Sequence, residues 1–260
     1  MKGLFYATSM VAMAAVIPSC GKGGEKKAAA DSTAMAADSN VVVLFDGTSL
    51  DGWRGYNKDT VPSAWTLEDG CIKINGSGAG EAGARNGGDL IFGAEKFGNF
   101  ELSFEWKVAK GSNSGVFYMI QEVPDTPSYY SAPEYQILDN ENHPDAKLGV
   151  DGNRKSASLY DMIPAKPQNS KPFGEWNTGK IMVYKGTVVH YQNGENVLEY
   201  HLWTPEWQAM LDKSKFSKDK NEKAYNLLLN CGGDQKEGYI GLQDHGDDVW
   251  YRNITVKKLD

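Results

Sequence analysis

The chain has 260 residues, of which 40% are hydrophobic and 23% charged, and this composition suits one large globular domain with a substantial core. Its formal net charge is −7 at pH 7 and no basic cluster offsets it, which argues against a nucleic acid as partner. Mean hydropathy is −0.50, and the chain has no apolar run of about eighteen residues, so a membrane-spanning helix is not expected.

The N-terminal residues have the form of a signal peptide. Lys2 supplies a positive charge, residues 4–17 form a short apolar run, and small residues precede Cys20. This ending resembles the lipobox of bacterial lipoproteins, in which the cysteine becomes the lipidated first residue. We therefore expect residues 1–19 to be a signal peptide and the protein to be exported, to the periplasm or the outer membrane surface. Its membrane contact would be only the lipid on Cys20. The alternative is a soluble protein with an apolar first helix.

The next segment is too polar to fold. Residues 20–40 are small and charged and contain no aromatic side chain, so we expect a flexible tether. Residues 41–260 then form a single domain. Its two cysteines, Cys71 and Cys231, either pair in the oxidising export compartment or remain inert buried thiols.

Short apolar runs between Gly, Asn and Asp turns predict strands along most of the domain. In chain order they are residues 41–45, 63–67, 71–74, 89–92, 99–109, 116–120, 134–139, 180–184, 188–192, 196–200, 225–229, 238–245 and 249–257. Thr204 and Pro205 predict the start of one short helix. About a dozen strands and one helix indicate an all-β fold, a two-sheet antiparallel jelly-roll sandwich.

Residues 134–139 are the stretch most suggestive of chemistry. In a strand, Glu134 and Gln136 share one face while Tyr135 points to the other. If a bulge precedes Asp139, its carboxylate joins the face of Glu134, and the two acids look into one cavity. The spacing resembles the catalytic strand of retaining jelly-roll β-glucanases, with the middle acid replaced by Gln136. The alternative is an ordinary solvated strand end.

A series of motifs in order resembles one known family. The motifs are LFDGTSLDGW at 44–53, FEWK at 104–107, NSGV at 113–116, EYQILD at 134–139, LYD at 159–161, GEWN at 174–177, GLQDHG at 241–246 and YRNI at 251–254. The family was once called domain of unknown function 1080 and is regarded as 3-keto-disaccharide hydrolases, or 3-keto-glycoside lyases and hydratases. The resemblance covers residues 41–260. It implies a concanavalin-like sandwich with a sugar site on its concave face.

The implied reaction sets the chemistry of the site. A ketone at C3 of a sugar acidifies the C2 proton, so a base can remove it and the C1 substituent can leave, after which water adds back. Such a site needs a base, an acid, and donors or a cation for the enolate. Glu134 and Asp139 are the first candidates for the acid and base roles. His245 is the next, since an imidazole exchanges protons near pH 7.

Further residues are expected to bind the substrate, a small oxidised glycoside or disaccharide. They are Glu105, Gln136, Lys155, Tyr160, Trp176, Asn177 and Gln243. Glu105 joins the site only if its strand face is the concave one. No cofactor is required by the pattern, although His143 could hold a divalent cation with the loop carboxylates Asp139 and Asp145; a solvated loop is the alternative. The competing functions are a non-catalytic carbohydrate-binding module and a conventional retaining glycosidase.

Overall fold

The computed structural model describes residues 40–78 and 83–260. The signal peptide, the lipidated Cys20 and nearly all of the tether expected from the sequence lie outside these residues. Within the described part of the chain, no helix has the length and apolar character needed to cross a bilayer.

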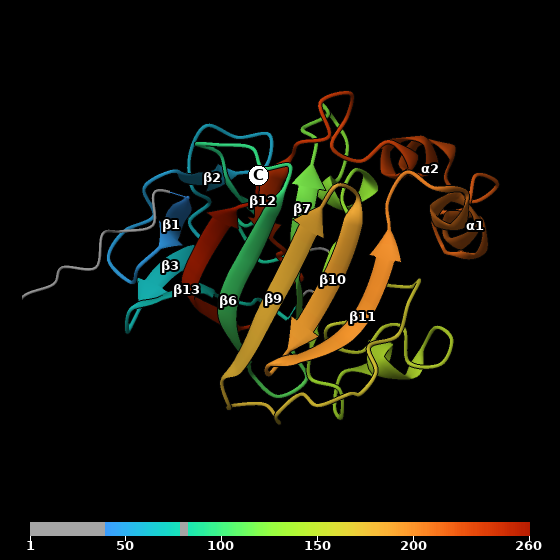
Figure 1. The fold of residues 1–260 in the computed structure, drawn as a ribbon. Helices are drawn as coiled ribbons and strands as arrows, with labels where there is room; N and C mark the ends of the chain where they lie inside the picture. Colours follow the sequence, from blue (N-terminus) through green and yellow to red (C-terminus); the bar gives the residue numbers. More distant parts are fainter. Residues whose placement is uncertain (1–39, 79–82) are drawn as a thin grey trace, which may run out of the picture. The chain divides into compact units, whose positions relative to one another are not determined.

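Two antiparallel sheets make up the domain (Figure 1). The larger sheet contains β1 (Val41–Phe45), β3 (Trp65–Glu68), β4 (Cys71–Ile74), β6 (Phe100–Val108), β9 (Asn177–Tyr184), β10 (Thr187–Gln192), β11 (Glu195–His201) and β13 (Val249–Lys258). The smaller sheet contains β2 (Trp53–Gly55), β5 (Leu90–Phe92), β7 (Asn113–Ile120), β8 (Glu134–Leu138) and β12 (Tyr239–Leu242). The strand orders are β11-β10-β9-β6-β13-β4-β3, with β1 beside β13, and β2-β5-β12-β7-β8.

The core lies between the two sheets. Strand β6 alternates strictly, so that its apolar residues, such as Phe104, are buried while Glu105 faces away from the core. From the other sheet, Tyr135 of β8 meets Phe104 edge to face, with ring centres 5.3 Å apart. The predicted two-sheet jelly-roll sandwich is therefore confirmed, and Glu134 and Gln136 lie on the outer side of the smaller sheet.

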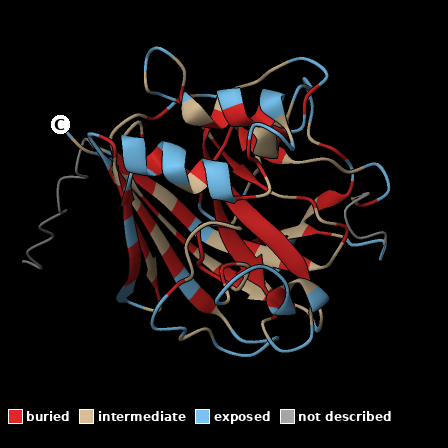
Figure 2. Ribbon diagram, turned by 90° about the vertical axis from the view of Figure 1, so that its right-hand side faces the viewer, coloured by how far each residue is buried: buried red, intermediate tan, exposed pale blue. Residues whose placement is uncertain are grey.

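Two helices cover part of the surface, and one of them corrects a prediction. Helix α1 (Pro205–Lys213) begins as expected, with the Thr204 hydroxyl accepting the N–H of Trp207. The strand predicted at 225–229 is wrong, because these residues belong to α2 (Glu222–Leu229). Asn221 caps that helix. Its apolar side faces the core, and Figure 2 shows the outer sides of the helices exposed above mostly buried strands.

Short helical turns lie on either side of β8, and both cysteines of the domain are buried. Two short 3-10 helices, η2 (Ser128–Tyr130) and η3 (Pro144–Lys147), flank β8 in the chain. Of the two alternatives left open for the cysteines, the structure has buried free thiols at Cys71 and Cys231.

Candidate active site

A pocket of about 530 Å³ opens on the outer side of the smaller sheet. Strand β8 contributes Glu134 and Gln136, and segments distant in sequence supply the rest. The lining comprises Gly83, Ala84, Asn86, Gly87, Gly88, Asp89, Asn113, Tyr129, Glu134, Gln136, Tyr160, Lys215, Gln243, Asp244 and His245. Its size and its convergent polar groups suit a small polar ligand such as a sugar.

Glu134 is the acid at the floor of this pocket. Only 7% of the residue is exposed, and a Cβ on Gly115, diagonally across on β7, would come within 2.5 Å of its Oε1 atom. Glycine is therefore needed at 115 to make room for the carboxyl group. Burial raises the pKa of Glu134 to about 8, with Lys215 opposing and Asp89 adding to the shift. At neutral pH, Glu134 is mainly protonated.

Asp89 is a second carboxyl group in the pocket, and the sequence reading did not identify it. Its Oδ1 atom accepts the N–H of Asp244 at 2.8 Å, and its other oxygen accepts the Ser128 hydroxyl. Burial raises the pKa of Asp89 to about 6, although the Ser128 hydrogen bond lowers it. Asp89 is thus mainly ionised at neutral pH. The available sequence signal was an acid between a Gly-Gly turn and a buried strand.

Asp244 organises the loop that leads to Asp89. Its carboxylate accepts the backbone N–H groups of Ala84, Gly88 and Gly246 at 2.7–3.0 Å. A Cβ at Gly87 would lie 2.0 Å from the Asp244 Oδ2 atom, so the loop can wrap this closely only with glycine there.

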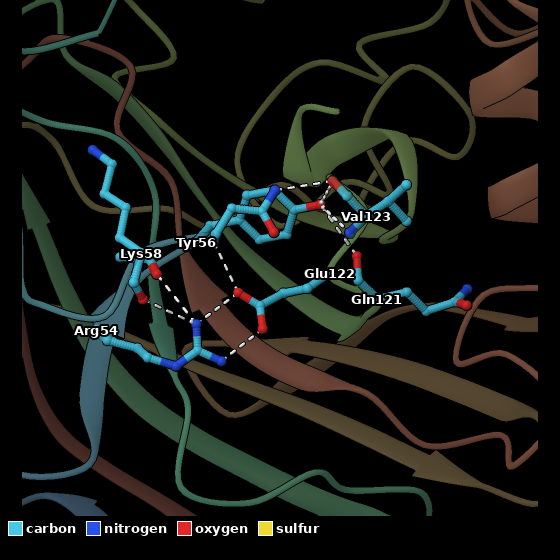
Figure 3. A network of polar contacts seen from close by, with 8 residues as sticks. Arg54, Tyr56, Lys58, Gln121, Glu122 and Val123 are labelled. Atoms are coloured by element: carbon cyan, nitrogen blue, oxygen red, sulfur yellow. Dashed lines mark hydrogen bonds and ion pairs between the residues drawn. The ribbon is translucent and has the colours of Figure 1, made fainter. Parts of the chain in front are cut away.

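Figure 3 shows a polar network around Arg54, Tyr56 and Glu122. Arg54 makes a two-point ion pair with Glu122, with both N–O distances at 2.6 Å. The same region contains Tyr56, whose N–H donates to the Asp89 carbonyl at 2.8 Å, and Lys58, whose Nζ donates to the Gly87 carbonyl at 2.7 Å. The network therefore fixes the position of the Asp89 side of the pocket.

Tyr160 and Lys215 form the side next to Glu134. The Tyr160 N–H donates to the Glu134 carbonyl at 3.1 Å, and the Lys215 N–H donates to Asp161 at 2.7 Å. The Lys215 Nζ lies 4.3 Å from the centre of the Tyr160 ring. This cation, also not identified from the sequence, is placed to stabilise negative charge developing on a ligand.

Five of the residues predicted from the sequence meet in this pocket. They are Glu134, Gln136, Tyr160, Gln243 and His245. Gln243 is held by its N–H, which donates to the Gly115 carbonyl at 2.9 Å. Among the described residues, its Oε1 atom is buried and has no hydrogen-bond partner. The alternation of β8 and the position of residues 243–245 after β12 bring these side chains together.

Asp139 does not reach the pocket. The β7–β8 register runs without a shift from Phe117 opposite Glu134 to Asn113 opposite Leu138, so the bulge required for Asp139 to join Glu134 is not formed. The Asp139 carboxylate instead accepts the N–H of Gly111 at 2.7 Å and the Asn142 side chain at 2.8 Å. The carboxylate therefore links the turn before β7 to the loop after β8.

Glu105 and Trp176 lie on the outer face of the larger sheet. Glu105 forms an ion pair with Arg252, at 2.7 Å, and accepts the Asn253 amide at 2.7 Å. The Arg252 guanidinium lies 4.0 Å from the centre of the Trp176 ring. The polar face of β6 is therefore not the face that carries the pocket, and the sequence alternative in which Glu105 is a surface charge is the one observed.

Lys155 and Asn177 are also outside the pocket. Lys155 lines a separate hollow of about 380 Å³ beside Lys147 and Lys166. Asn177 is fully buried, and its Oδ1 atom accepts the N–H of Lys171 at 2.7 Å. Its amide holds the start of β9 in place.

The cation candidates are only partly as expected. His143 lies beside His245, with ring centres 5.8 Å apart, and both are close to Asp247. Asp139 is not part of this group, because its oxygens are bound to the surrounding loop.

Comparisons with known proteins agree with this architecture. Residues 40–257 match the model of the 3-keto-alpha-glucoside-1,2-lyase-like domain. A curated Bacteroides thetaiotaomicron protein named 3-keto-disaccharide hydrolase is 58% identical over 293 aligned positions, covering 100% of both chains. A crystal structure of a candidate glycosyl hydrolase from Parabacteroides distasonis is 27% identical, with a TM-score of 0.70, over 85% of this chain and 94% of that one. A second crystal structure from the same organism is 24% identical, with a TM-score of 0.63. The match covers 84% of this chain and 99% of that one and shows the same fold.

Proposed function

The chain belongs to the 3-keto-alpha-glucoside-1,2-lyase-like family, and from this premise we propose that it cleaves the glycosidic bond of glycosides already oxidised at C3. It is a carbohydrate-active, glycoside-cleaving enzyme. The proposal that the substrate is oxidised at C3 rests on two carboxyl groups in one pocket, Asp89 and Glu134. Their pKa values of about 6 and about 8 leave Asp89 mainly ionised and Glu134 mainly protonated at pH 7.

The reaction proceeds by elimination in this proposal. A base takes the C2 proton, and the electrons of the C–H bond form an enolate on the C3 oxygen. The enolate then collapses to a C1–C2 double bond, the C1–O bond breaks, and the leaving oxygen takes a proton from an acid. The products are an alcohol and an unsaturated keto sugar. Addition of water, with hydroxyl at C1 and hydrogen at C2, completes a net hydrolysis.

The two carboxyl groups have the protonation states that these steps need. Asp89, mainly ionised, is the base for the C2 proton, and Glu134, mainly protonated, is the acid for the leaving oxygen. The Lys215 ammonium, which packs on Tyr160 and lines the same pocket, is the cation that we assign to the negative charge that develops in between. Gln136 and Gln243 can hydrogen-bond sugar hydroxyls, since both line the same pocket.

Paired substrates test the proposal. The purified protein is incubated with an aryl glucoside and with the same glucoside oxidised at C3. Release of the aryl group from the keto form alone supports the proposal. Release from the plain glucoside would instead indicate a conventional glycosidase, and binding without release would indicate a carbohydrate-binding module; either result overturns it.

Deuterium in the solvent separates elimination from direct hydrolysis. In D₂O, the elimination route is expected to place deuterium at C2 of the released keto sugar, beyond the exchange seen when that sugar is incubated alone. Mass spectrometry of the earliest product measures this label. Unlabelled early product would show that the C2 proton is never removed, and the assignment of Asp89 as base would then be wrong.

The rate is expected to follow a bell-shaped pH profile with its optimum near pH 7. Asp89 must be ionised, so the rate rises with pH through about 6; Glu134 must be protonated, so the rate falls through about 8. The measurement is kcat/KM on the keto glucoside between pH 5 and pH 9. A rate that rises steadily to pH 9 would exclude Glu134 as the acid.

A further inference from the structure

A cluster of potential metal ligands lies at the edge of the pocket. His143 lies in the loop after β8, and His245 and Asp247 lie in the turn after β12. One ligand atom from each of the three residues lies within 4.8 Å of the others. All three side chains are partly exposed, so an ion can reach them from solvent or from the pocket.

Two buried polar atoms at or beside the cluster have no hydrogen-bond partner in the described part of the chain. The His245 Nδ1 atom is buried without a hydrogen-bond partner among the described residues, and it lies 4.0 Å from the Asp247 Oδ2 atom. That oxygen accepts the N–H of Asn113 at 3.0 Å. The Oδ1 atom of Asn113 is itself buried and unpartnered within the described chain. Buried polar atoms left without partners are unfavourable, and a bound cation would give the His245 Nδ1 atom a partner.

We propose that His143, His245 and Asp247 bind one divalent transition-metal ion at the edge of the pocket. Two imidazoles and one carboxylate favour a transition-metal ion such as Zn²⁺ over Ca²⁺ and Mg²⁺, which prefer all-oxygen sites. Three protein ligands leave coordination positions open for a substrate oxygen, as in catalytic metal sites. The cluster differs from the cation site considered from the sequence, in which the loop carboxylates Asp139 and Asp145 would join His143.

Binding changes one local contact. The Nδ1 atom of His143 now accepts the N–H of Asp145 at 3.1 Å, at the start of η3. Ligation through this nitrogen would exchange that hydrogen bond for a metal bond.

The role of the ion rests on the proposed function. His245 lines the same pocket as Glu134 and Gln243, so an ion held by His245 is next to the bound sugar. As a Lewis acid it would withdraw charge from the C3 oxygen and add to the effect of Lys215. This would make the C2 proton easier to remove.

Metal binding is tested directly on the purified protein. After removal of metals by a chelator, titration calorimetry with MnCl₂ and with ZnCl₂ is expected to show one site per chain, and elemental analysis after dialysis to show one retained ion. His143→Ala and Asp247→Asn are expected to lose this site. His201→Ala is the matched control, because His201 is an exposed histidine 3.9 Å from Glu199 on β11, and it should bind the ion like the wild type.

Each result decides between the alternatives. Wild-type protein that binds neither ion at one per chain overturns the inference, as does unchanged binding in both His143→Ala and Asp247→Asn. Circular dichroism of the metal-free variants, compared with the metal-free wild type, shows whether a loss of binding reflects unfolding. If the ion binds but keto glucosides are not cleaved, the proposed function fails and the site stands. If keto glucosides are cleaved at the full rate by metal-free protein, the Lewis-acid role is wrong.

Discussion

Glu134→Gln is expected to lower kcat/KM on a 3-keto glucoside by about 10²–10⁴-fold, the usual contribution of a positioned acid or base. Glutamine has the shape of the protonated acid, so it fits the space beside Gly115 and preserves the pocket. It cannot donate a proton to the leaving oxygen. The measurement is steady-state kinetics together with ligand binding, which should remain measurable.

The control is another carboxylate removed in the same way. Glu105→Gln alters an acid paired with Arg252 on the outer face of the larger sheet, and it should leave kcat/KM unchanged. A Glu134→Gln enzyme with the wild-type rate would contradict the role given to Glu134. A large loss in Glu105→Gln would show that the substrate binds on the opposite face.

The same Glu134→Gln change is expected to stabilise the protein above pH 5. Burial raises the pKa of Glu134 from 4.5 to about 8, so the folded state retains a proton that the unfolded state releases. The folded state therefore loses stability as the pH rises from about 4.5 to about 8, and glutamine removes this loss. At pH 7 the expected gain in the free energy of unfolding is about 3 kcal/mol, since one pKa unit corresponds to about 1.4 kcal/mol.

Denaturant unfolding at pH 5 and at pH 7.5 measures this effect. The stability difference between variant and wild type should be small at the lower pH and grow toward the higher one. Glu105 provides the opposite case, because its hydrogen bonds to Asn253 and Arg252 outweigh burial and lower its pKa. Glu105→Gln should therefore gain no stability as the pH rises. A difference for Glu134→Gln that does not change with pH would show that the carboxyl group is not desolvated.

The two predictions together describe a site that lowers the free energy of unfolding. A buried acid in a pocket destabilises the native state by the same desolvation that sets its protonation for catalysis. The surrounding structure holds it in place nonetheless, through the register of β7 and β8 and the glycine at 115. A buried acid that destabilises the fold is expected where a function requires it. A strand with only a structural role would gain nothing from such a residue.

The faces of the strands were predictable because alternation is local. The pattern of residues 99–109 matches β6, and the assignment of Glu134 and Gln136 to one face of β8 is confirmed. Residues 225–229 were misassigned because a short Leu-rich run fits a buried strand and a buried helix equally. The cap at Asn221, three residues before Ala224, was the signal that distinguishes them.

The sequence by itself determined the sandwich, the direction in which each strand presents its side chains, and the series of motifs that defines the family. These follow from periodicity and turn chemistry, which act between neighbours in the chain. Only the tertiary structure decided which sheet face carries the pocket, and it separated Asp139 and Glu105 from Glu134. It also brought Asp89, Lys215 and His245 to Glu134, because their proximity depends on how two sheets and distant loops pack. The pKa of Glu134 has the same origin, since desolvation depends on everything that surrounds the carboxyl group.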